Sequence, residues 1–147
     1  MKRYDFHSHL GKTRSGDANS AAQLVEDLKA FGISKVGICS LSGNGMRAQN
    51  DLVYEAMCEF PEVIEGYADI DPKAPDAIDE VHRTLGECHM NGVKFMPWKH
   101  GYAAENCPSL GGVLDAIGEY GVHVQIHGGA SPRMSLRISS PACTSSR

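Results

Sequence analysis

Short runs in which apolar and polar residues alternate recur along the chain, and longer segments with helical periodicity separate them. Five of these runs predict β-strands, at residues 4–9, 35–41, 63–70, 92–97 and 122–127. The segments between them predict four helices. Strands and helices that alternate at this spacing are typical of βαβ units, in which the strands form a parallel sheet.

Each predicted helix has an apolar stripe that would cover one face of this sheet. The first helix begins with a capping box, in which the Ser20 hydroxyl caps the helix and the Gln23 side chain reaches back. The second helix spans about residues 50–60, the third begins at Pro75, and the fourth spans residues 110–120. In chain order, the stripes consist of Leu24, Val25, Leu28 and Phe31; Val53, Met57 and Phe60; Ile78, Val81, Leu85 and Cys88; and Val113, Leu114 and Ile117.

The two faces of the predicted strands differ in polarity. Val93 and Phe95 lie on one face of the fourth strand and Lys94 lies on the other, and the last strand repeats this pattern. A doubly wound sheet would be apolar on both faces, so the pattern favours a barrel with polar residues inside and a site at the carboxyl ends of its strands. We predict an α/β fold, a partial TIM (β/α)8 barrel made of the first five β/α units with parallel strands.

The first predicted strand carries two histidines one residue apart. Because side chains alternate along a strand, Asp5, His7 and His9 share one face. Tyr4 and Phe6 share the other face, where they are predicted to pack against a covering layer. Two imidazoles on one face can bind a single divalent ion. The alternative is a surface His-x-His pair that binds nothing, and the apolar neighbours on the strand favour the metal site.

The composition excludes several classes of function. Of the 147 residues, 41% are hydrophobic and 22% are charged, which fits one globular domain. A net charge of −4 without a basic cluster predicts no nucleic-acid partner and no binding to an anionic membrane. No apolar run approaches the roughly 18 residues of a spanning helix, and Met1 leads straight into a strand rather than a signal peptide. We expect a cytoplasmic protein that acts on a small-molecule substrate.

The cysteines are odd in number and widely spaced, and they include no Cys-x-x-Cys pair. This pattern predicts that they are reduced and pack as small hydrophobic side chains, with no thiolate role. They are Cys39, Cys58, Cys88, Cys107 and Cys143.

Four strand-associated runs carry a family resemblance. They read DFHSH (5–9), GYADIDP (66–72), GVKF (92–95) and VQIH (124–127). In this order and spacing the chain resembles the amidohydrolase superfamily, in particular its amidohydrolase-related TIM-barrel hydrolases and decarboxylases, which include aminocarboxymuconate-semialdehyde decarboxylase. The resemblance extends over residues 3–129.

The resemblance implies a catalytic divalent metal, usually zinc, bound by His7, His9 and His127. It implies hydrolysis of C–N or C–O bonds, or decarboxylation, by metal-activated water. Lys94 is the candidate catalytic residue, with three open roles: a point charge for a substrate carboxylate, a carbamylated bridge between two metals, or an interior lysine paired with Asp69 or Asp71.

Other polar residues near strand ends are weaker candidates. Trp98, His100 and Tyr102 follow the fourth strand and are predicted to bind substrate, with ordinary loop packing as the alternative. His82 and His89 lie seven positions apart on one helix, about 10 Å along its axis, so we assign them to a solvated face.

Two further positions are assigned structural roles. His123 begins the last strand, at the bottom of a barrel, and Asp71 precedes Pro72 in a pattern typical of a turn.

The end of the chain departs from the barrel pattern. A full barrel needs about 250 residues, and residues 130–147 show neither a helical stripe nor a strand signal. We interpret residues 1–129 as the N-terminal part of the barrel and residues 130–147 as a non-native or disordered tail. The open sheet edges then predict self-association.

Strands one and five would lie roughly 19 Å apart in a flat sheet, so their histidines converge only if the sheet curls. Three functions stay open at this point: a metal-dependent hydrolase or decarboxylase, a phosphoesterase of the polymerase-and-histidinol-phosphatase type, and a catalytically inactive barrel fragment.

Overall fold

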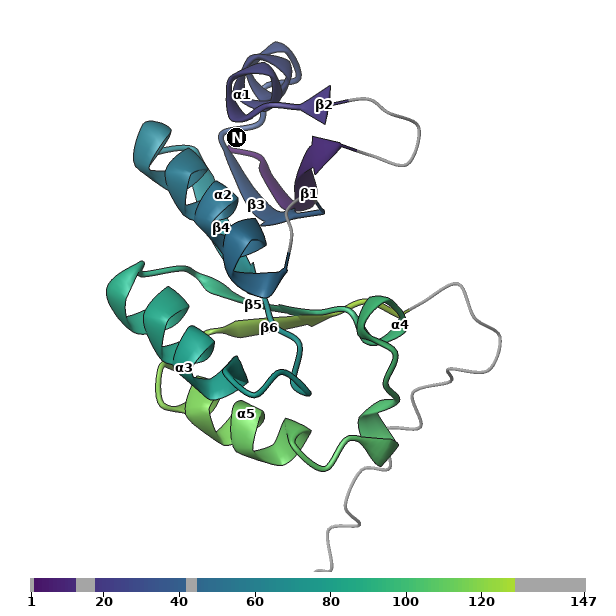
Figure 1. The fold of residues 1–147 in the computed structure, drawn as a ribbon. Coiled ribbons are helices and arrows are strands. Elements are labelled where there is room, and N and C mark those ends of the chain that lie inside the picture. Colours follow the sequence, from purple (N-terminus) through teal and green to yellow (C-terminus); the bar gives the residue numbers. More distant parts are fainter. Residues whose placement is uncertain (1, 13–17, 42–44, 129–147) are drawn as a thin grey trace, which may run out of the picture.

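The computed structural model describes residues 2–12, 18–41 and 45–128 (Figure 1). The predicted tail at residues 130–147 lies outside the described residues. The strands are β1 (Tyr4–Lys12), β2 (Ala18–Asn19), β3 (Lys35–Ser40), β4 (Ile64–Asp69), β5 (Gly92–Phe95) and β6 (His123–Ile126). The helices are α1 (Ala21–Ala30), α2 (Met46–Glu59), α3 (Ala77–Val81), α4 (Pro97–His100) and α5 (Leu110–Gly118), with a π-helical turn η1 (His82–Glu87) and a 3-10 turn η2 (Ala104–Asn106).

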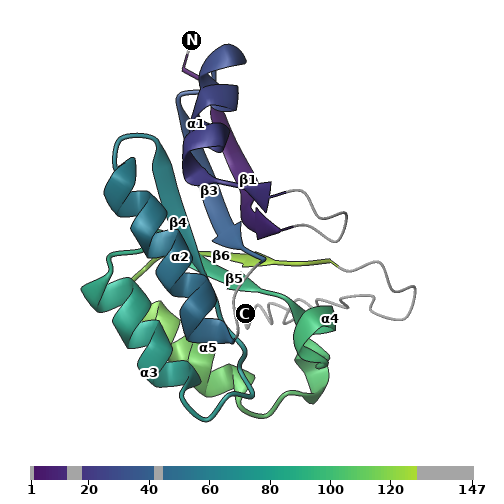
Figure 2. The same cartoon turned by 45° about the horizontal axis from the view of Figure 1, so that its top comes forward.

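The strands form one sheet in the order β2-β1-β3-β4-β5-β6. All neighbours pair in parallel except β1 and β2, which form an antiparallel pair. The sheet curls as a half-barrel, and α1, α2, α3 and α5 cover its convex face (Figures 1 and 2). Strands in sequential order with helices on one face only are the arrangement of a barrel, which confirms the predicted partial TIM barrel over a doubly wound sheet.

The curl brings the first and last parallel strands together on the concave face. The side-chain amide of Gln125 on β6 donates a hydrogen bond to the backbone carbonyl of Phe6 on β1, at 3.0 Å. The centroids of the Phe6 and His123 rings lie 6.2 Å apart, so β1 and β6 also approach each other near the bottom of the half-barrel. This contact fits the structural role predicted for His123.

A β-bulge in β1 changes which residues face inward. The pairing with β3 shifts by one residue, so that Phe6 and His7 together lie opposite Gly37. A Cβ atom at Gly37 would lie 2.9 Å from the Phe6 carbonyl and 2.8 Å from the Tyr67 ring, so only glycine fits there. The predicted placement of Tyr4 and Phe6 on the opposite face is therefore wrong, whereas His7 and His9 share one face as predicted. Phe6 contacts the Tyr67 ring on the concave side, and Tyr4 donates a hydrogen bond to Glu65.

The hydrophobic core lies between the sheet and the helices. Val36, Ile38, Val53, Val81 and Val93 are completely or almost completely buried in it. Burial of such side chains provides the main free energy that holds helices onto the sheet.

Three predicted stripe residues are instead exposed: Phe31 (72%), Ile78 (44%) and Leu114 (43%). Phe31 is the C-cap of α1 and lies beyond its last turn. Ile78 lies where α3 faces Gly112 of α5.

The predicted third helix is interrupted. It forms α3 and then the π-helical turn η1, within which the Thr84 hydroxyl lies within hydrogen-bond distance of the carbonyls of Glu80 and Val81. The capping box of α1 is also only half formed. The Gln23 backbone N–H donates to the Ser20 hydroxyl as predicted. The Gln23 side-chain amide, however, donates to Asp27 instead of bonding to Ser20.

Two short elements were not predicted. β2 pairs with the end of β1 where a loop was expected, and α4 follows β5 directly. Helix α2 begins four residues before the predicted start. Within the described ranges, no helix is both long and apolar enough to cross a membrane.

A buried polar network fixes α2 to β4 and α3. The Asn50 side chain, which is fully buried, accepts a hydrogen bond from the Asp69 backbone N–H at 2.8 Å and donates to the Asp69 carbonyl and to Glu80. Arg83 neutralises Glu80 through two short hydrogen bonds and also pairs with Asp51. Because all its members are satisfied, the network holds the end of β4 in place.

We expect Asn50→Ala to lower the free energy of unfolding by about 3 kcal/mol, because it leaves the buried Asp69 N–H without its partner and removes one hydrogen bond to Glu80, which keeps those from Arg83. Urea unfolding followed by circular dichroism measures this change. Asn106→Ala, at an exposed position in η2, is the matched control and should change stability by less than about 0.5 kcal/mol. A loss below about 1 kcal/mol at Asn50 would contradict the assigned role of the network.

Candidate metal centre

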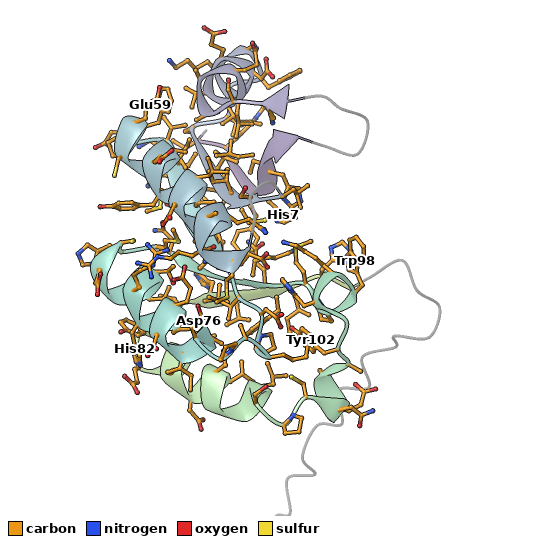
Figure 3. The ribbon with its side chains drawn as sticks, viewed as in Figure 1. His7, Glu59, Asp76, His82, Trp98 and Tyr102 are labelled. Atoms are coloured by element: carbon orange, nitrogen blue, oxygen red, sulfur yellow. The ribbon has the colours of Figure 1, made fainter. Side chains whose placement is uncertain are left out.

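The candidate site lies at the carboxyl ends of the parallel strands, on the concave face. His9 on β1 pairs in register with Cys39 on β3, and Lys94 lies on β5 two strands further along. Figure 3 shows His7 and Trp98 on the side of the sheet opposite the helical residues Glu59 and His82. Placement at strand ends is the usual position of an active site in this architecture.

Three metal-binding side chains gather at this point. Within residues 2–12, 18–41 and 45–128, His7, His9 and Cys39 form the one group of three donors whose ligand atoms all lie within 4.8 Å of one another. The two imidazole rings stand nearly perpendicular, with centroids 4.5 Å apart. The Cys39 Sγ atom lies 3.1 Å from His9 Nδ1. Two nitrogens and one sulfur in this arrangement are suitable donors for a divalent transition metal.

Gln125 sets the tautomer of His7. Because the Gln125 amide nitrogen donates to the Phe6 carbonyl, its oxygen is the atom that faces His7 Nδ1, at 3.0 Å. His7 Nδ1 must therefore carry the proton and donate it to Gln125. This leaves the lone pair on His7 Nε2 for a metal, the outer-sphere arrangement common around metal-bound histidines.

The surroundings keep both histidines neutral. Burial, followed by the charge of Lys94, lowers the pKa of His7. Burial, followed by the charges of His7 and Lys94, lowers the pKa of His9 to about 4. At neutral pH both imidazoles therefore offer lone pairs, which is the form that binds metals.

Lys94 and Cys39 are the other titratable groups at the centre. Burial lowers the pKa of Lys94, which is only 5% exposed and whose ammonium group makes no hydrogen bond or ion pair with the described residues. Burial also raises the pKa of the Cys39 thiol to about 12, against the opposing charge of Lys94. An ammonium group held without an anion is suited to receive one from a ligand.

The lysine-carboxylate pair considered as an alternative for Lys94 does not form. The Asp69 carboxylate, which is 1% exposed, pairs with Lys99 at 2.5 Å and with His100 Nε2 at 3.1 Å. Asp71 lies 3.5 Å from the other ring nitrogen of His100 and accepts the Lys73 backbone N–H, as expected of a turn. His100 is thus held between two carboxylates.

The remaining predicted site residues lie around this centre. His127 follows β6, and its charge contributes to lowering the pKa values of His7 and His9. Its ring lies 5.8 Å from that of Trp98, which is 44% exposed. His127 is not within 4.8 Å of the other donors, so its role as a ligand stays a prediction.

Tyr102 is buried, and its hydroxyl has no hydrogen-bond partner among the described residues. Burial raises its pKa. Two residues before it, His100 lines a cavity of about 510 Å³. This cavity is bounded by Gly45, Met46, Arg47, Gln49, Asp71, Ala74, Asp76, Lys99 and His100.

The histidines assigned to a solvated face lie away from the centre. His89 is exposed, whereas His82 is half-buried and its Nδ1 lies 2.8 Å from the Tyr120 hydroxyl.

Two residues of the centre were missed in the sequence. The sequence pattern predicts only a buried hydrophobic side chain for Cys39 and a polar residue on the inner face for Gln125. Both lie near the ends of predicted strands on the polar face, and this position is the signal that could have identified them.

Comparisons with known proteins address the fold. No protein-family model and no curated protein matches the sequence. A 5-carboxyvanillate decarboxylase from Novosphingobium aromaticivorans, solved with manganese and a nitrobenzoic acid, aligns with a TM-score of 0.71 and 17% identity over 89% of this chain and 52% of its own. A 2,6-dihydroxybenzoate decarboxylase from Rhizobium aligns with a TM-score of 0.71 and 13% identity, over 93% of this chain and 53% of its own. A protein described as an amidohydrolase II aligns with a TM-score of 0.72 and 16% identity, over 93% of this chain and 54% of its own.

These proteins share the fold of this chain, which spans about half of their length. The fold expected from the family resemblance, part of a TIM barrel, is therefore confirmed.

We expect Gln125→Leu to weaken zinc binding by about 10- to 100-fold, because His7 loses the partner that fixes its tautomer. Isothermal titration calorimetry measures the affinity, and ¹⁵N NMR of the imidazoles reports the tautomer directly. Gln23→Leu, on the exposed face of α1, is the matched control. Unchanged zinc affinity together with an unchanged His7 tautomer would contradict this role of Gln125.

Proposed function

We propose that this chain forms the metal-binding part of an amidohydrolase-type active site, which hydrolyses or decarboxylates a small carboxylate-bearing substrate with the help of a divalent metal. The observation that carries the proposal is the pair of neutral imidazoles at the end of β1, with one of them oriented by Gln125. Amidohydrolases and decarboxylases of the same fold support the reaction class.

The donors present fit a divalent metal. His7 and His9 supply nitrogen ligands, and His127 is proposed as a further ligand from the last strand. We propose zinc because imidazole-rich sites suit it, and manganese is the alternative suggested by the decarboxylase solved with that ion. A bound divalent ion of this kind supplies Lewis-acid chemistry and lowers the pKa of a water molecule.

The side chains around the metal position would bind and orient the substrate. Lys94 presents a buried ammonium group toward the histidines and has no anionic partner of its own in the described part of the chain. We infer that it holds a substrate carboxylate as a point charge. Trp98, His100 and Tyr102 follow the same strand and are proposed to contact the rest of the substrate.

The first test measures metal and activity together. The full chain is freed of metal with a chelator, loaded with zinc or manganese, desalted and analysed by mass spectrometry for metal content. It is then assayed for carbon dioxide release from hydroxybenzoates and for hydrolysis of aryl esters and lactones. We expect about one metal per chain and metal-dependent turnover, with losses of at least about a hundredfold in His7→Ala and His9→Ala.

His89→Ala, at an exposed position remote from the centre, should retain the activity and metal content of the unmodified chain. A chain that retains no metal at micromolar concentration would contradict the proposal. A chain that retains metal without turnover would limit the proposal to metal binding.

Lys94 allows a separate prediction about substrate class. Lys94→Met should raise KM for carboxylate substrates by at least about tenfold and leave hydrolysis of neutral esters nearly unchanged, because it removes a charge-assisted contact worth about 1.5–3 kcal/mol. Ala22→Met, on the exposed face of α1, is a control for the added methionine. Equal losses on charged and neutral substrates would contradict a carboxylate-binding role. A carbamate signal in ¹³C NMR with labelled bicarbonate would favour the bridging role instead.

A further inference from the structure

The Cys39 side chain occupies an unusual environment for a buried cysteine. Its exposed fraction is 1%, yet it does not belong to the apolar cluster between sheet and helices, in which Cys88 is included. Cys39 instead faces the concave side, beside His9 and within electrostatic range of Lys94 and Asp69. Packing as a small hydrophobe therefore describes Cys88 but does not account for the position of Cys39.

We propose that Cys39 is a protein ligand of the metal bound by His7 and His9, so that the centre is a mixed nitrogen and sulfur site assembled from the two neighbouring strands β1 and β3. This inference rests on the metal site of the proposed function and adds to it a thiolate that favours zinc over manganese. Thiolates select thiophilic ions, whereas manganese prefers oxygen ligands.

Strand register explains how Cys39 reaches the histidines. His9 and Cys39 are paired residues on adjacent parallel strands, so both side chains leave the sheet at the same level and on the same face. His7 lies two residues before His9 and therefore shares this face by the alternation of side chains along β1. Strand geometry thus places the three donors on one face, and Gln125 on β6 holds the His7 ring there.

The distances require little movement on metal binding. Sulfur and nitrogen ligands of a tetrahedral zinc ion lie about 3.6 Å apart, given bond lengths near 2.3 and 2.05 Å. Cys39 Sγ and His9 Nδ1 lie 3.1 Å apart. The two atoms therefore need to move apart by only about half an ångström to bind the same ion. Binding replaces the thiol S–H bond with a sulfur–metal bond, and the proton is released to the buffer.

Cobalt titration of the metal-free chain tests the proposal. Cobalt(II) bound to a thiolate gives an intense near-ultraviolet charge-transfer band that imidazole ligands do not give. We expect this band in the unmodified chain and in the His127→Ala variant. The Cys58→Ser variant, which replaces an exposed cysteine, is the matched control and should also show the band. Cys39→Ser should lose the band and bind cobalt at least about tenfold more weakly.

The outcomes separate this inference from the proposed function. One cobalt per chain without the band would overturn the role of Cys39 and leave the histidine site intact. No bound cobalt at all would remove the metal site and with it the proposed function. Should Cys39→Ser fail to fold, X-ray absorption of the zinc-loaded unmodified chain decides, because a thiolate ligand gives a sulfur scatterer at about 2.3 Å.

Discussion

The structure depends on one hydrogen-bonded bridge across the concave face of the sheet. The Gln125 side chain joins β6 to the backbone of β1, two strands that would be far apart in a flat sheet. The same amide fixes the proton on His7. Curvature of the sheet and readiness of the site to bind a metal are therefore coupled through a single side chain.

Much of the fold could be predicted from the sequence because strands and helices have different hydrophobic periods. The five parallel strands and the one-sided helical layer follow from the apolar positions, as Val93 and Phe95 illustrate. The bulge in β1 could not be predicted this way, because an inserted residue leaves the local pattern intact and changes only its phase relative to β3. The exposure of Phe31 likewise depends on where α1 ends.

The candidate site could be predicted only in part. His7 and His9 are recognisable because a single strand presents them together, and Lys94 stands out as a polar residue between apolar neighbours. The roles of Cys39 and Gln125 depend on the register between strands and on the curl of the sheet, which are properties of the assembled fold. The periodicity within one strand carries no information about the register between strands or about the curl of the sheet.

The bulge gives β1 two functions that a regular strand could not combine. Tyr4 and Phe6 point to the same interior as His7 and His9. One strand therefore supplies both aromatic side chains and, nearer its carboxyl end, metal-binding groups. Deletion of Phe6 would restore regular pairing with β3 and leave Tyr4 opposite Lys35, but it would remove the ring that contacts Tyr67. The sheet would survive such a deletion, but the interior below the histidines would lose the ring that contacts Tyr4, Tyr67 and His123 together.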